Sequence, residues 1–207
     1  MNCINVRPME KARYLPLIYS SLLALFLSAC GSAPTQDDAS GTINPNARTV
    51  DIPAAATSEY QDVLRAIDAK KWSRAQSLLE SMQSKYPNLA SVNTMLGWTY
   101  WQAGKTKQAE TELQAVTQQK GLYKSDAFNY LAIIYREQGK FVKAEKLYQQ
   151  ALRTWPRDPV LHKNLGILYE LYLGRLKDAL SAYKQAQAIN GNDKKLNGWI
   201  KDLERRT

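Results

Sequence analysis

The stretch LAIIYREQGKFVKAEKLY, residues 131–148, decides how this chain folds. Its apolar residues recur at intervals of three and four, which is the period of an amphipathic helix rather than of a strand. Gly139 divides it into two helical halves, so it predicts a helix, a tight turn and a second helix. Similar stretches lie on either side, as LGWTYWQAGKTKQAETEL (96–113) and LGILYELYLGRLKDALSAY (165–183).

The three stretches and a more divergent copy at residues 66–87 form a repeat. In the three clear copies a Leu and a small residue are followed by Tyr, a Gly turn, a basic residue and Ala. The marker alanines are 34, 35 and 35 residues apart, at Ala75, Ala109, Ala144 and Ala179. Such a period indicates stacked units, because one helical hairpin cannot bury its own apolar face.

This period and these markers resemble the tetratricopeptide repeat, over about residues 57–191. In the third copy the match includes Leu131, Ala132, Tyr135, Ala144 and Pro156. The resemblance implies an all-α superhelical stack of about four helix-turn-helix repeats. The tail NDKKLNGWIKDLERRT (192–207) adds a closing helix, because its apolar residues share one face.

Three local features refine this prediction. The first copy has Asp62-Val63 where the Leu and the small residue belong, so its first helix is expected to pack irregularly as a cap. The fourth copy has one extra residue near Leu173-Gly174, which predicts either a longer helix or a looser turn. Asp158-Pro159 predicts a helix start, with Asp as N-cap and Pro as the first helical residue.

The first 29 residues are predicted to be an export signal. Basic residues (Arg7, Lys11, Arg13) precede the apolar run LPLIYSSLLALFL (15–27), which is too short for a permanent membrane span. Met9 offers an alternative start to Met1.

The sequence Leu27-Ser28-Ala29-Cys30 resembles the lipobox of bacterial lipoproteins. The resemblance implies cleavage before Cys30 and acylation of that residue with diacylglycerol and a further acyl chain such as palmitate; the alternative is a plain secretory signal. The residue after Cys30 is Gly31 rather than Asp, which resembles lipoproteins that are sorted to the outer membrane. We therefore expect a lipid-anchored outer-membrane protein whose domain faces the periplasm.

The mature chain is predicted to have two parts. Residues 30–58 comprise the acylated Cys30 and a tether rich in Gly, Ser, Ala, Thr and Pro, with a typical span of about 30 Å. Residues 59–207 comprise the repeat domain and its capping helix.

No catalytic motif is present. His162 is the single histidine, and both cysteines (Cys3, Cys30) precede the repeats. The sequence therefore predicts no enzyme activity, no metal site and no cofactor apart from the covalent lipid.

The resemblance to the tetratricopeptide repeat implies a concave groove, lined by the first helix of each pair, that binds a protein or peptide. The predicted groove residues are Met95, Trp98, Trp101, Asn129, Tyr130, Ile133, Arg136, Lys163, Asn164 and Ile167. Exposed Trp favours a binding hot spot. The alternative is that Trp98 packs against the next repeat and Trp101 against the first. The two asparagines are expected to pair with the main chain of a bound segment.

The net charge of +9 favours an acidic partner. Basic residues concentrate in the second half of the repeats, at Lys140, Lys143, Lys146, Arg153, Arg157, Arg175 and Lys177. An exported lipoprotein rarely meets nucleic acid, so we expect none as a partner. The second hypothesis is therefore a module that binds anionic envelope polysaccharide or peptidoglycan through this basic face.

The layout of lipobox, short tether and about four repeats is similar to that of lipoproteins that assemble type IV pilus secretins and tight-adherence pili. Lipoproteins of outer-membrane protein assembly and adaptors of cell-wall hydrolases are also similar in layout. The resemblance implies a scaffold for envelope, pilus or secretin assembly, without choosing among these systems.

Overall fold

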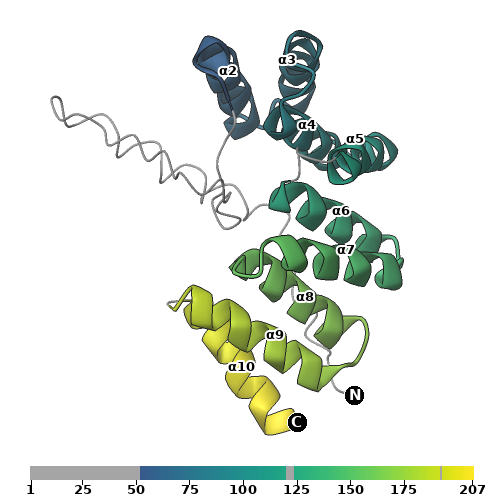
Figure 1. Cartoon of the computed structure of the whole chain (residues 1–207), viewed down its shortest axis with the longest axis vertical. Coiled ribbons are helices and arrows are strands. Elements are labelled where there is room, and N and C mark those ends of the chain that lie inside the picture. Colours follow the sequence, from purple (N-terminus) through teal and green to yellow (C-terminus); the bar gives the residue numbers. More distant parts are fainter. Residues whose placement is uncertain (1–51, 120–123, 192) are drawn as a thin grey trace, which may run out of the picture. The chain divides into compact units, whose positions relative to one another are not determined.

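The computed structural model describes residues 52–119, 124–191 and 193–207, all within one compact unit that spans Asn44–Thr207. The predicted signal, Cys30 and most of the tether lie outside the described residues. Within them the chain forms helices and no strand (Figure 1). The elements are η2 (Ala54–Ala56), α2 (Thr57–Asp68), α3 (Trp72–Lys85), α4 (Ala90–Gln102), α5 (Thr106–Gln118), α6 (Ser125–Glu137), α7 (Phe141–Thr154), α8 (Pro159–Leu171), α9 (Leu176–Ile189) and α10 (Lys194–Arg206).

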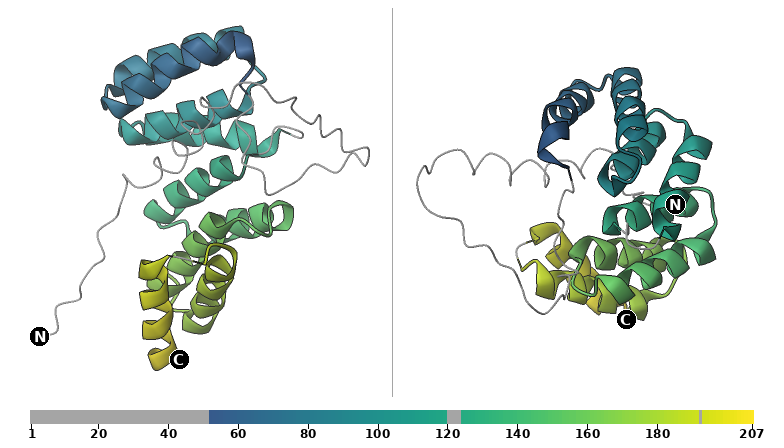
Figure 2. Two further views of the ribbon diagram at one scale, coloured as in Figure 1. Left: turned by 90° about the vertical axis from the view of Figure 1, so that its left-hand side faces the viewer. Right: turned by 45° about the horizontal axis from the view of Figure 1, so that its top comes forward.

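The helices form four hairpins and one closing helix. Each hairpin pairs two consecutive helices, α2 with α3 through α8 with α9, and its second helix contacts the first helix of the next hairpin. Figure 2 shows the hairpins following one another along the stack. The predicted all-α stack of four repeats with a capping helix is confirmed.

The stack has two layers that differ in how closely their helices approach. Helix α6 contacts both α4 and α8, and these contacts are more extensive than any among α3, α5, α7 and α9. Helices that approach more closely lie on the inside of a curve, so α4, α6 and α8 form the inner layer. This layer carries all ten predicted groove residues.

Glycine at the crossing of the paired helices allows their close approach. A Cβ atom on Gly97 would lie 2.7 Å from Cγ of Leu113, and one on Gly166 would lie 2.4 Å from Cε1 of Tyr183. Both distances are shorter than real Cβ contacts. The repeat therefore needs a small residue here, and the third copy has Ala132, which is fully buried.

A polar ladder links successive repeats. In the second copy, the hydroxyl of Tyr100 donates a hydrogen bond to Glu80 in the preceding repeat, with an O–O distance of 2.6 Å. Lys105 lies over the same ring and donates to Gln76, also in the preceding repeat, at 2.7 Å. Burial, followed by the bond to Glu80, raises the pKa of Tyr100.

The fourth repeat has the same ladder in charged form. The hydroxyl of Tyr169 donates to Glu145 of the preceding repeat at 3.1 Å, and Arg175 donates to the same carboxylate at 2.8 Å. The Arg175 guanidinium also lies 4.4 Å from the centre of the Tyr169 ring. The marker Tyr and the basic residue after the turn thus serve to join repeats.

The extra residue of the fourth copy is accommodated in the turn. Helices α4 and α8 both have 13 residues. In the second copy the N–H of Lys105 donates to the carbonyl of Tyr100, five residues back, whereas Arg175 donates to Tyr169, six residues back. Of the two predicted outcomes, the structure shows a looser turn, with Gly174 at φ +65°.

The helix start at Asp158 is confirmed. Its side chain accepts hydrogen bonds from the N–H groups of Val160 at 2.9 Å and Leu161 at 3.3 Å, and Pro159 is the first helical residue. The first helix of the first copy, α2, was expected to pack irregularly but is a regular helix of 12 residues. Its Val63 is buried, and Asp62 pairs with exposed Arg65.

Helix α10 closes the stack and occupies the position of the first helix of a fifth repeat. It begins 35 residues after α8, and Leu196, Ile200 and Leu203 are buried. Exposed Lys201 and Glu204 occupy the places of Gly166 and Tyr169. A further helix would have to desolvate these two charged side chains in order to dock, which is unfavourable.

We predict that Gly166→Ala destabilises the domain by about 1–3 kcal/mol, because the added methyl group overlaps the Tyr183 ring. The control is Gly198→Ala in α10, where nothing lies within 4 Å of the new Cβ. That change should stabilise by about 0.5–1 kcal/mol, since Ala is the better helix former. Thermal unfolding measures both, and equal midpoints for the two variants would contradict the proposed crossing.

Candidate functional site

The predicted groove residues all lie on α4, α6 and α8, but most are less accessible than a solvent-filled groove implies. Lys163 and Ile167 are half-buried. The other eight are buried, namely Met95, Trp98, Trp101, Asn129, Tyr130, Ile133, Arg136 and Asn164. Their assignment as partner-binding residues stays a prediction. The contacts that these side chains make within the domain indicate which of their atoms are still available to a partner.

Trp98 lies between its two neighbouring repeats. Its ring meets that of Trp72 edge-on, with centroids 5.8 Å apart, and lies 6.4 Å from the Tyr130 ring of α6. The indole therefore packs against the following repeat, as the alternative interpretation expected, and against the preceding one as well.

Trp101 is tied to the following repeat. Its indole N–H donates to Oε2 of Glu137 at the end of α6, with an N–O distance of 3.0 Å. The alternative interpretation placed this ring against the first repeat, and this hydrogen bond joins it to the third.

The two predicted asparagines meet each other. Nδ2 of Asn164 donates to Oδ1 of Asn129 at 2.6 Å, and the residues are 0% and 1% exposed. This buried bond connects α8 with α6 and so contributes to the packing of the inner layer. The pairing differs from the expectation that both side chains bind the main chain of a bound segment.

One stripe of α4 carries buried polar atoms without partners. Oγ1 of Thr94, Nε1 of Trp98 and Nε2 of Gln102 are buried and find no hydrogen-bond partner among the described residues. The three residues are four apart, so they share one face of the helix. Leaving a buried donor unpaired costs about 1–3 kcal/mol. Such a row suits a ligand that supplies acceptors.

Arg136 is the corresponding feature of α6. It is 9% exposed, its Nε and Nη1 atoms have no hydrogen-bond partner among the described residues, and its guanidinium lies 5.5 Å from the centre of the Tyr172 ring. The neighbouring carboxylates are engaged elsewhere: Glu137 with Trp101, and Glu170 with Arg206 and Tyr183. Sequence reasoning missed Tyr172, although the extra residue in its turn was a signal.

Lys163 faces the capping helix. Its ammonium group lies 3.5 Å from Oδ2 of Asp193, the N-cap of α10, which also accepts from the N–H of Leu196 at 3.0 Å. Burial alone would raise the pKa of Asp193. The hydrogen bond from Leu196 and the charge of Lys163 outweigh burial and lower that pKa.

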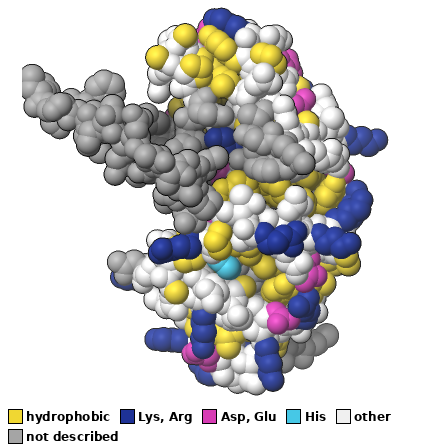
Figure 3. Space-filling model, viewed as in Figure 1, with side chains coloured by type: hydrophobic (Ala, Val, Ile, Leu, Met, Phe, Trp, Pro, Cys, Tyr) yellow, Lys and Arg dark blue, Asp and Glu magenta, His cyan; other side chains and the backbone are white. Residues whose placement is uncertain are grey.

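Part of the predicted basic face has internal partners. Lys140 and Lys143 both lie over the Tyr135 ring, and Arg175 pairs with Glu145 and Asp178. The remaining basic residues are exposed, at Lys146, Arg153, Arg157 and Lys177. Figure 3 shows basic side chains spread over one face of the molecule. Binding of an anionic polymer stays a prediction that rests on these four.

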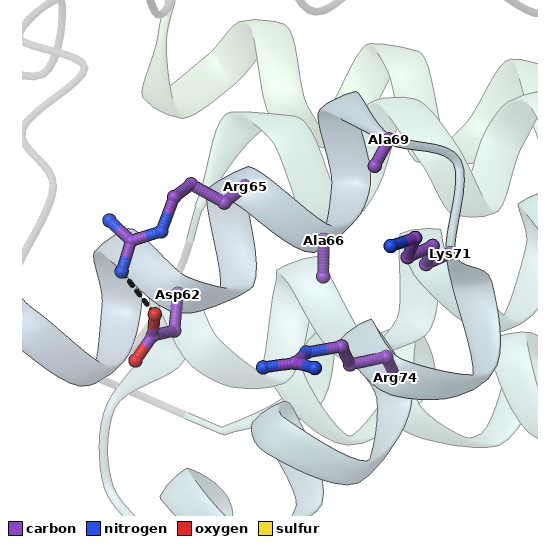
Figure 4. Close-up of a pocket in the computed structure, with 6 residues that line it drawn as sticks. All are labelled: Asp62, Arg65, Ala66, Ala69, Lys71 and Arg74. Carbon is purple, nitrogen blue, oxygen red and sulfur yellow. Dashed lines mark hydrogen bonds and ion pairs between the residues drawn. The ribbon is translucent and has the colours of Figure 1, made fainter.

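A shallow basic pocket lies between α2 and α3, at the N-terminal end of the stack (Figure 4). Its lining residues are Asp62, Arg65, Ala66, Ala69, Lys71 and Arg74. In each later repeat the first helix contacts the second helix of the preceding repeat. Charged residues replace buried apolar ones here, so this surface is the polar end of the repeat array.

The described residues contain no group of His, Cys, Asp and Glu that could hold a metal ion. None of the helices in these ranges is both long enough and apolar enough to cross a membrane.

Comparison with known families identifies the class of protein. Two family models, both described as tetratricopeptide repeat, match residues 66–127 and 123–190. The chain therefore belongs to the tetratricopeptide repeat proteins, a class whose members generally act as protein–protein interaction scaffolds. No curated protein sequence matches it.

Solved structures agree on the fold. TTC0263, a thermophilic tetratricopeptide repeat protein of Thermus thermophilus, aligns with a TM-score of 0.60 and 20% identity, over 71% of this chain and 80% of that one. MamA of AMB-1 aligns with a TM-score of 0.55 and 19% identity, over 73% and 82%. A repeat protein from Parabacteroides merdae aligns with a TM-score of 0.59 and 16% identity, over 74% and 62%. At such identities the likeness concerns the fold alone.

We predict that Asp193→Ala destabilises the domain by about 1 kcal/mol at neutral pH, because α10 loses its N-cap. Asp193→Asn keeps the cap and removes the charge, so it isolates the contribution of the lowered pKa. That contribution is present above the unfolded pKa of about 3.9 and is lost as the pH falls through the lower folded value. Urea unfolding of wild type and Asn variant should thus converge in acid; a constant difference would contradict the assignment.

Proposed function

We propose that this protein is a lipid-anchored scaffold of the bacterial outer membrane that binds an extended segment of a partner protein along its inner helix layer. The observation that carries the binding proposal is the stripe of Thr94, Trp98 and Gln102 on α4, whose buried polar atoms have no partner among the described residues. Membership of a class of interaction scaffolds supports the same conclusion.

An extended polypeptide has the chemistry that this stripe needs. Its carbonyl groups are strong acceptors at regular intervals, and those of a bound segment have no partner within their own chain. Trp98 Nε1 and Gln102 Nε2 are donors. A bound segment therefore removes the cost of leaving these donors unpaired, and the rings of Trp72, Trp98 and Tyr130 provide apolar surface beside them.

The membrane anchor is supported by the sequence. The LSAC motif at residues 27–30 begins at the last residue of a 13-residue apolar run, 15–27, and a polar stretch separates Cys30 from α2. Acyl chains on Cys30 would hold the domain at the membrane, since each buried CH₂ contributes about 0.8 kcal/mol. The layout supports a role in assembling an envelope structure such as a pilus or secretin, in which the groove recruits one component.

A photo-crosslinking residue at Ile167, half-buried on the inner helix α8, tests the binding proposal in cells. The control position is Lys146, exposed on α7 in the outer layer. We expect a discrete protein adduct from position 167 and none from position 146, and mass spectrometry identifies the captured protein. Adducts from position 146 alone would instead favour the basic face, especially if raised salt removed them.

We predict that Trp98→Phe reduces the adduct yield from position 167 about two- to tenfold, which corresponds to one hydrogen bond of about 0.5–1.5 kcal/mol. Trp155→Phe is the matched control, because Trp155 is half-buried beside Phe128 at the end of α7. Equal yields from the two variants would exclude a direct role for the Trp98 indole.

We predict that Cys30→Ser abolishes incorporation of labelled palmitate and releases the protein from the outer-membrane fraction, because serine cannot form the thioether to lipid. Cys3→Ser, within the predicted signal, is the control and should change neither property. Continued labelling of the Cys30 variant would overturn the predicted anchor.

A further inference from the structure

We propose that the edge of the groove at the turns of the third and fourth repeats recognises an acidic residue flanked by apolar residues in the partner. This recognition edge consists of Arg136, Phe141, Leu171 and Tyr172. The inference rests on the proposed function and names the chemistry of the partner that the groove accepts.

The extra residue of the fourth turn builds this edge. It lengthens the turn after α8 and adds nothing to the helix, whose length equals that of α4. Tyr172, in the lengthened turn, lies with its ring centroid 5.2 Å from that of Phe141 and 5.5 Å from the Arg136 guanidinium. The turn thus brings an aromatic ring between two repeats, at one end of the inner layer.

The Arg136 guanidinium lacks the counter-charge that its burial calls for. It is 9% exposed and pairs with no carboxylate among the described residues. A buried charge without a partner is strongly unfavourable, and the nearest acids of α6 and α8 are held by Trp101 and Arg206. Arg favours planar, bidentate recognition, and a carboxylate brought by the partner would complete this site.

Two exposed apolar residues adjoin the aromatic residues of this edge in the sequence. Val142 and Leu171 are the large hydrophobic residues that stand exposed in the described ranges, at 64% and 49%. Val142 follows Phe141 and Leu171 precedes Tyr172 in the sequence, and these two aromatic rings are in contact. Exposed apolar residues at these positions suit a ligand whose carboxylate is flanked by aliphatic side chains.

A pair of fluorescent peptide pools tests the inference on the full-length protein in detergent. Each pool has Gly/Ser/Thr flanks around a fixed centre, Leu-Glu-Leu in one and the uncharged Leu-Gln-Leu in the other. We expect the acidic pool to bind at least tenfold more tightly. Arg136→Met should remove this preference without weakening the uncharged pool, whereas Lys146→Met, an exposed cation of α7, should leave it intact.

Thermal unfolding separates recognition from folding. If Arg136 serves a partner, Arg136→Met should unfold at the same or a higher temperature, because it removes a buried unpaired charge. A lower unfolding temperature would assign Arg136 to the packing of the domain and overturn the inference. Tyr172→Ala should weaken binding of both pools, because it removes the apolar part of the edge.

The two proposals fail in distinguishable ways. If position 167 captures a partner but the protein does not prefer the acidic pool, the groove binds protein and the recognition edge is wrong. If the acidic pool is preferred equally by wild type and Arg136→Met, another cation is responsible and the inference is again overturned. If neither experiment detects binding, both proposals fall.

Discussion

Each helix of the repeats has apolar side chains on two faces. The other helix of its hairpin covers only one of these faces. The stack exists because the next pair must cover the other. At the crossing within a pair, Gly97 and Gly166 allow the helices to touch. Between pairs, the hydrogen bonds of Tyr100 and Tyr169 to carboxylates of the preceding repeat fix where the next pair docks. Remaining features of the domain depend on these two contacts, which place the inner-layer helices side by side.

Placing helices side by side also determines which polar groups are satisfied. Asn129 and Asn164 are brought together and pair with each other, and Trp101 is brought to Glu137. The same packing leaves Nε1 of Trp98 and the Nε and Nη1 atoms of Arg136 buried without hydrogen-bond partners among the described residues. Buried polar atoms are normally hydrogen-bonded in stable proteins, so these unpaired atoms are the exceptions that call for an explanation.

The two ends of the array are built differently. The N-terminal helix α2 has Asp62 at a place where later repeats bury Leu, and α10 has Lys201 and Glu204 on its outer surface. Both ends are therefore polar, which restricts apolar contact to the interior of the stack. The recognition edge, with exposed Leu171, and the nearby sequence position Val142 differ from these polar ends in being exposed and apolar.

The sequence by itself determined the repeat, the helical hairpins, the small residues at their crossing, the cap at Asp158 and the closing helix, because each depends on residues close together in the chain. The resemblance to the tetratricopeptide repeat also indicated which helices form the inner layer. Only the tertiary structure decided that Asn164 pairs with Asn129, that the fourth copy has a looser turn rather than a longer helix, and that Tyr172 meets Arg136. These outcomes join residues about 35 positions apart, or choose between two backbone paths of similar local propensity, and packing across repeats settles both.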